Sequence, residues 1–192
     1  MEKVKYKKSL CVFCGSKNGN NLIYKKAAKE LGTYLAKNKI RLVYGGGSLG
    51  LMGELSSSVN RNKGDILGVI PKHLLQIEGI NKNHGETIIT DDMHTRKKKM
   101  YNSSDAFLCL PGGIGTLEEV SETITWFQLG ISRKPIYFLN INGYWDNFKV
   151  LLEQFVALEF ANKDLLNYFN FFENVETLLP VLLNSFDIDS NE

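Results

Sequence analysis

Two short stretches of the chain carry residue types that could bind and act on a phosphorylated ligand. The first is a basic run over residues 94–99 (HTRKKK), and the second is a glycine-rich turn over residues 111–119 (PGGIGTLEE). Glycines let the backbone approach a ligand closely, and the free amides at a helix start bind anions such as phosphate. The turn therefore predicts a phosphate site built from Gly112, Gly113, Ile114, Gly115 and Thr116.

Glu119 could act either in catalysis or as part of the cap of the helix that carries it. Thr116 and Glu119 have the T-x-x-E spacing of a capping box, in which the glutamate reaches back to the threonine amide. Glu118 could do the same less well, and the two glutamates cannot both form the box. The local pattern by itself favours the cap, with catalysis by Glu119 as the alternative.

Arg96 and Lys97 lie near the start of a helix expected over residues 93–103, after a strand over 87–90. Cations oppose the dipole at a helix N-terminus, so an arginine there is easier to explain if it pairs with a carboxylate or a phosphate. Both residues are candidates for the ligand crevice. For Lys98 and Lys99 we expect a solvated helix face.

An earlier turn over residues 45–50 (GGGSLG) formally matches the G-x-G-x-x-G dinucleotide motif. No acidic residue ends the next strand, which stops at Pro71, so a conventional NAD site is disfavoured. Gly46 and Gly47 either face a nucleotide or only allow tight packing of the next helix.

The elements that position these turns alternate along the chain. Apolar runs predict strands over residues 9–16, 41–44, 66–70, 87–90, 106–110 and 135–141. Helical spacing predicts helices over residues 21–39, 49–60, 93–103, 116–129, 144–160 and 175–183. This order predicts one α/β domain over residues 1–192, a Rossmann-like, doubly wound parallel sheet with helices on both faces. Its ligand should lie outside the carboxyl ends of the strands.

Composition limits the possible partners. The 192 residues are 43% hydrophobic and carry a net charge of +2, which gives no argument for nucleic acid or a membrane surface. No apolar stretch is long enough to span a bilayer, so we expect a cytoplasmic protein. Cys11 and Cys14 form a C-x-x-C within a strand, where they should face opposite sides as core residues. No cluster has metal-ligand spacing, so no metal is expected.

Three motifs together identify a resemblance. Residues 45–53 (GGGSLGLMG), 93–97 (MHTRK) and 111–119 (PGGIGTLEE) occur in this order and spacing. They resemble the LOG (Lonely Guy) family of cytokinin riboside 5′-monophosphate phosphoribohydrolases, and the likeness covers roughly residues 8–183.

The resemblance implies a Rossmann-like homodimer that hydrolyses a purine nucleoside 5′-monophosphate to free base and ribose 5-phosphate without a cofactor. AMP is a substrate of many bacterial members, which behave as AMP nucleosidases. The catalytic pair falls on Arg96 and Glu119. The nucleotide contacts fall on Arg96, Lys97, Gly113, Ile114, Gly115, Thr116, Leu117, Glu118, Glu119 and Thr125.

One position departs from the family as we align it. Plant members have a glutamate where His73 stands, so His73 is a substrate-binding candidate whose contact would differ from theirs. Members have also been labelled lysine decarboxylases. That reaction needs pyridoxal phosphate on a lysine, and no lysine here has a suitable setting.

The expected mechanism follows from charge. Breaking a glycosidic bond builds positive charge on the sugar, which a carboxylate such as Glu119 stabilises while it orients water. The turn amides hold the 5′-phosphate, and Arg96 steadies Glu119, the phosphate or the leaving base. The rival hypothesis is a non-catalytic nucleotide-binding sensor module.

Overall fold

The computed structural model describes residues 8–80 and 84–188. Its strands are β1 Lys8–Phe13, β2 Ile40–Tyr44, β3 Ile66–Pro71, β4 Glu86–Thr90, β5 Ala106–Cys109, β6 Ile136–Leu139 and β7 Phe169–Phe172. Its α-helices are α1 Leu22–Lys37, α2 Gly50–Arg61, α3 Leu75–Glu78, α4 Met93–Asn102, α5 Ile114–Gln128, α6 Asp146–Ala157 and α7 Val175–Ile188. Short 3-10 turns are η1 Lys72–Leu74, η2 Ile141–Gly143 and η3 Lys163–Tyr168.

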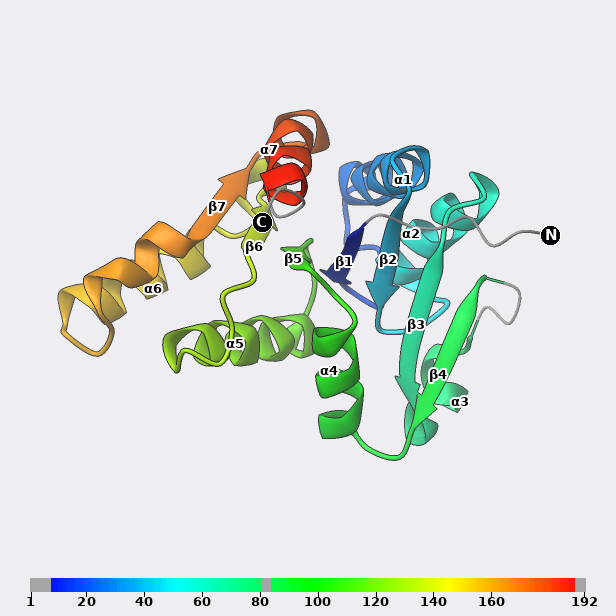
Figure 1. Ribbon diagram of the computed structural model, residues 1–192, viewed down its shortest axis with the longest axis horizontal. Coiled ribbons are helices and arrows are strands. Elements are labelled where there is room, and N and C mark those ends of the chain that lie inside the picture. The colour runs from blue at the N-terminus through cyan, green and yellow to red at the C-terminus, as the bar shows by residue number, and fades with distance from the viewer. Residues whose placement is uncertain (1–7, 81–83, 189–192) are drawn as a thin grey trace.

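All seven strands form one parallel sheet in the order β4-β3-β2-β1-β5-β6-β7 (Figure 1). The chain builds outward from β1 to β4, then returns to the other side of β1 and builds outward again from β5. The loops after β1 and β5 therefore diverge at the centre of the sheet. Such a switch point leaves a crevice at the carboxyl ends of the strands.

Side chains alternate across β1 and divide the core in two. Leu10 and Val12 join the apolar cluster under α1, α2 and α7, whereas Cys11 and Phe13 join the cluster under α4, α5 and α6. Helices therefore cover both faces, and the strands are buried on both sides, as their uniformly apolar runs predicted.

The predicted fold class and six predicted strands are confirmed, and most ends differ by one to three residues. The seventh strand, β7, was missed because Phe169–Phe172 is short and shows no clear alternation; its pairing with β6 makes it a strand. An aspartate caps α4, because the Asp92 carboxylate accepts from the Thr95 amide at 2.7 Å. Among the described residues, no helix has the length and apolarity needed to cross a membrane.

Candidate active site

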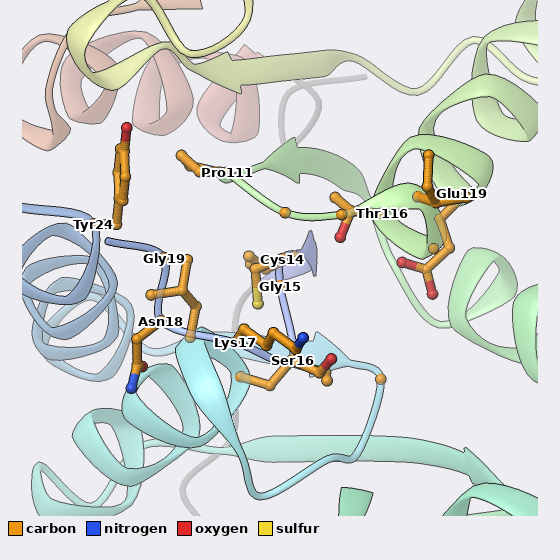
Figure 2. Close-up of a pocket in the computed structure, with 18 of the residues that line it drawn as sticks. Cys14, Gly15, Ser16, Lys17, Asn18, Gly19, Tyr24, Pro111, Thr116 and Glu119 are labelled. Carbon is orange, nitrogen blue, oxygen red and sulfur yellow. The ribbon is translucent and has the colours of Figure 1, made fainter. Parts of the chain in front are cut away.

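A cavity of about 410 Å³ lies at the switch point. The loop after β1 and the turn after β5 lie across from one another around it, and Glu119 on α5 lies beside the turn (Figure 2). Arg96 of α4 also lines the cavity. The hydrogen bond from the Gly15 amide to the Pro111 carbonyl, 3.1 Å long, joins the loop and the turn. The two predicted catalytic residues and the predicted phosphate turn therefore meet in one place.

Arg96 is buried, with 5% of its surface exposed, and its guanidinium is held from three sides. Nε donates to the Val69 carbonyl at 3.0 Å, Nη2 donates to the Gly45 carbonyl at 3.3 Å, and Nη1 lies 3.2 Å from Glu119 Oε1. A Cβ on Gly45 would lie 2.1 Å from Nη2, so only glycine leaves room for the guanidinium. The arginine thus presents a fixed charge to Glu119.

Glu119 is 8% exposed and is the carboxylate of α5 that faces the cavity. Burial raises its pKa from the ordinary 4.5 to about 7, although the Arg96 guanidinium acts in the opposite direction. The charges of Glu118 and Glu78 also raise this pKa, and that of Lys97 lowers it. A carboxyl group with a pKa near 7 can exchange a proton at neutral pH, as a general base must.

The predicted capping box is wrong. Helix α5 begins at Ile114 with Gly113 as N-cap, so Thr116 already lies inside the first turn and no side chain caps the helix. Glu119 is therefore too far along the helix to reach the N-cap amide, and it pairs with Arg96 instead. The structure excludes the alternative that the local pattern favoured.

The start of α5 leaves backbone amides free toward the cavity. In the part of the chain that is described, no hydrogen bond occupies the amides of Ile114, Gly115 or Thr116, and the Leu117 amide bonds to the Gly113 carbonyl at 3.0 Å. At α2, by contrast, the Gly15 carbonyl accepts from the first amides, and at α1 the Asn21 side chain accepts from an amide. Within the described residues, the start of α5 thus leaves three consecutive amides open, and such amides bind phosphate.

Gly112 allows the sharp entry into α5. A Cβ at this position would lie 2.1 Å from Thr116 Oγ1, and the Gly112 carbonyl accepts a short hydrogen bond from the Tyr144 hydroxyl. The turn is thus braced from both sides, which keeps the free amides aimed at one point.

Lys97 and Glu118 were predicted as nucleotide contacts, but the structure joins them to each other. Lys97 Nζ lies 2.5 Å from Glu118 Oε1 and 3.0 Å from Glu122 Oε1, and neither Lys97 nor Glu118 lines the large cavity. Lys98 and Lys99 are exposed, as predicted.

Five further predicted contacts lie outside the lining of the cavity, and one of them is Leu117, half-buried on α5. His73 is exposed in η1, and Thr125 is exposed on α5, where its hydroxyl donates to the Ser121 carbonyl at 2.8 Å. Gly46 and Gly47 are buried in the turn after β2, and of its three glycines Gly45 reaches the cavity.

Glu78, at the end of α3, is a site residue that the sequence reasoning missed. It lines the cavity, and its Oε2 is buried without a hydrogen-bond partner among the described residues. Burial raises the pKa of Glu78, and Arg96 lowers it. Ser48 anchors this segment, because its amide and its hydroxyl each donate to the Glu78 carbonyl at 3.0 Å. The irregular stretch after β3 had no periodic signal that singled this residue out.

Lys17 was also missed. It lines the cavity from the loop after β1, and no ion pair or hydrogen bond engages its ammonium within the described residues. In Figure 2 this loop faces the turn that carries Pro111 and Thr116. A lysine in a glycine-containing loop does not by itself indicate a ligand in the sequence. The position of Lys17 opposite the open amides of α5 indicates one only in the folded protein.

The cysteines behave as predicted for core residues. Cys11 and Cys14 are buried in the two different apolar clusters, and Cys109 is buried on β5. Burial raises the pKa of each thiol, which opposes formation of a reactive thiolate. No group of His, Cys, Asp or Glu side chains within the described ranges is arranged to hold a metal ion.

Comparison with known proteins gives close relatives. The family model described as "Possible lysine decarboxylase" matches residues 52–182. The chain is 50% identical over 155 residues to the cytokinin riboside 5′-monophosphate phosphoribohydrolase LOG1 of Arabidopsis thaliana, covering 81% of this chain and 73% of that protein. It is 43% identical over 175 residues to the probable cytokinin riboside 5′-monophosphate phosphoribohydrolase LOG4 of Oryza sativa subsp. japonica, covering 91% and 76%.

Solved structures share the architecture at lower identity. The molybdenum cofactor binding protein of Rippkaea orientalis matches with a TM-score of 0.71 and 21% identity, over 94% of this chain and 98% of that chain. The Moco carrier protein of Chlamydomonas reinhardtii matches with a TM-score of 0.69 and 21% identity, over 92% and 96%. These likenesses establish the fold and carry no statement about the ligand.

Proposed function

Because the chain belongs to the LOG family of cytokinin riboside 5′-monophosphate phosphoribohydrolases, we propose that it hydrolyses the N-glycosidic bond of a purine nucleoside 5′-monophosphate. The observation that carries this proposal is the buried pair of Arg96 and Glu119 beside the open amides of α5 in one cavity. A binding module would need the amides alone. The pair adds a fixed cation and a carboxyl group that titrates near neutral pH.

Phosphate binding positions the substrate in this proposal. The amides of Ile114, Gly115 and Thr116 hold the 5′-phosphate, and the Lys17 ammonium adds a positive charge from the facing loop. Gly112 keeps the turn in place. With the phosphate fixed, the ribose extends toward Glu119, so the reacting bond is held close to the carboxylate.

The chemical step uses one water molecule. The water oxygen bonds to C1′ of the ribose, the C1′–N9 bond breaks, and its electron pair leaves with the base. Glu119 in its ionised form accepts a proton from the water and stabilises the positive charge that develops on the sugar. Arg96 favours that ionised form. The base takes up a proton from solvent and protonated Glu119 returns its proton to solvent, so the products are free base and ribose 5-phosphate.

The test is release of free base. The purified chain is incubated with AMP and with isopentenyladenosine monophosphate, and the products are separated by chromatography. Glu119→Gln keeps the size of the side chain and should abolish release while nucleotide binding persists. The control is Glu30→Gln, a change to an exposed α1 residue that should act as wild type. Nucleotide binding without release by the wild type would refute the proposal and favour the sensor hypothesis.

We further propose a homodimer that works in the cytoplasm. Exposed large apolar side chains gather along α6 and the segment that follows it; they are Val150, Leu151, Phe155, Leu158 and Phe160. Such a set is unusual on the surface of a monomer and supports self-association. Light scattering coupled to size-exclusion chromatography measures the mass, and a value near 21.7 kDa would contradict the dimer.

A further inference from the structure

Lys97 is a buried cation next to the proposed catalytic pair. Its side chain is 9% exposed, and its ammonium lies within 3.0 Å of two carboxylates, those of Glu118 and Glu122. Two ion pairs satisfy a single ammonium group well, because each carboxylate accepts one of its three hydrogen atoms.

The ion pairs follow the geometry of the two helices. Arg96 and Lys97 are consecutive on α4, and their partners come from one stretch of α5. Glu118 and Glu122 are four residues apart and share a helix face, whereas Glu119 points about 100° away around the helix. The two cations therefore form ion pairs with adjacent faces of α5, and these pairs fix the rotation of α5 about its axis relative to α4.

The surroundings of Lys97 leave little room for another role. Its side chain borders a small space of about 10 Å³, which Glu119, Phe13, Tyr101 and Trp126 also line. The titratable groups that face it are Tyr101 from its own helix and the three glutamates of α5. To bind a phosphate in the active-site cavity, Lys97 would have to break its ion pair with Glu122. The Glu122 carboxylate, which is only one-quarter exposed, would then be left without a cation.

We propose that Lys97 is a positioning residue for the hydrolysis, which holds Glu118 and Glu122 so that Glu119 faces Arg96, and that it does not bind the 5′-phosphate. This inference rests on the proposed function. The charge of Lys97 also lowers the pKa of Glu119, and the charge of Glu118 raises it. Loss of Lys97 thus removes two things: the ion pairs that position α5, and a charge that favours ionised Glu119.

The test is Lys97→Met, with Lys98→Met as the matched control on an exposed neighbour. We expect kcat for AMP to fall about tenfold or more, because the reacting carboxylate is misplaced and harder to ionise, while KM and the Kd of ribose 5-phosphate stay within about threefold. The acidic limb of the kcat profile moves to higher pH. Lys97→Arg, which keeps the charge, restores most of kcat.

A role in phosphate binding predicts the opposite division. If Lys97→Met weakens ribose 5-phosphate binding about tenfold with kcat unchanged, Lys97 is a phosphate ligand and the proposal is overturned. Should Lys97→Met fail to fold, Glu118→Gln combined with Glu122→Gln decides the question. Positioning predicts a lower kcat there, whereas a phosphate ligand released from its carboxylates would leave kcat unchanged.

A second readout separates this proposal from the proposed function. If the wild type releases no base, carbon NMR titration still measures the pKa of Glu119, assigned by comparison with Glu119→Gln. A higher value in Lys97→Met than in the wild type and Lys98→Met supports the positioning role. An unchanged value overturns it.

Discussion

The raised pKa of Glu119 makes a quantitative prediction about pH. The perturbation is a change from pH 8 to pH 5, and the reacting form is the ionised carboxylate. With a pKa of about 7, about 90% of Glu119 is ionised at pH 8 and about 1% at pH 5. We therefore expect kcat/KM to fall about ninety-fold across this range. An ordinary glutamate with a pKa of 4.5 would remain mostly ionised at pH 5, and the same change would lower kcat/KM less than about twofold.

The assay is initial-rate release of base from AMP at half-unit steps of pH, with kcat and kcat/KM fitted separately. The 5′-phosphate of the substrate also loses a proton near pH 6, so its contribution must be removed. Glu119→Gln provides this correction, because the pH dependence of its Kd for AMP reports the phosphate and the rest of the cavity without Glu119. A corrected profile that stays flat down to pH 5 would refute the argument that burial controls the ionisation of Glu119.

Three other predictions test separate parts of the site. Because the pKa of Glu119 is about 7 in the folded state and 4.5 in the unfolded chain, its protonation stabilises the fold by about 3 kcal/mol below pH 4.5, and this stabilisation is lost as pH rises through 7. Urea unfolding should therefore show the stability of Glu119→Gln rising relative to that of the wild type between pH 4.5 and 7, and a constant difference would contradict this. Gly112→Ala places a Cβ 2.1 Å from Thr116 Oγ1, and calorimetry should show ribose 5-phosphate binding weakened about tenfold; unchanged binding would show that the turn can relax. Lys17→Ala should weaken the same binding about threefold or more with kcat within about twofold, whereas the exposed Lys26→Ala should change neither, and equal effects of the two would remove Lys17 from the site.

The site depends on Arg96 in two different ways. Its guanidinium is bonded to the carbonyls of Val69 and Gly45, so it joins β3, the turn after β2 and α5. It is also the main charge that keeps the pKa of Glu119 from rising further. Orientation and electrostatics therefore come from one side chain, which explains why Gly45 must have no Cβ.

Much of the architecture could be predicted from local pattern. Apolar runs buried on both faces identify the strands, and helical spacing identifies α1, α2 and α4. The short edge strand β7 escaped because its four residues become a strand through pairing with β6. The glycine-rich turn after β5 was identified correctly, but the start of its helix was placed two residues late, at Thr116.

The order of residues alone determined which groups this protein has for its chemistry: a turn with open amides, an arginine and lysine at one helix start, and glutamates at another. Only the tertiary structure decided their partners. Arg96 faces Glu119 because β5 lies beside β1 and brings α4 and α5 together, a contact across 23 positions that no local periodicity encodes. The same packing buries Glu119 and raises its pKa, and it brings Glu78 and Lys17 to the cavity from segments with no signal of their own. Burial and long-range pairing are properties of the folded sheet, and they turn a pattern typical of a helix cap into a titrating carboxyl group.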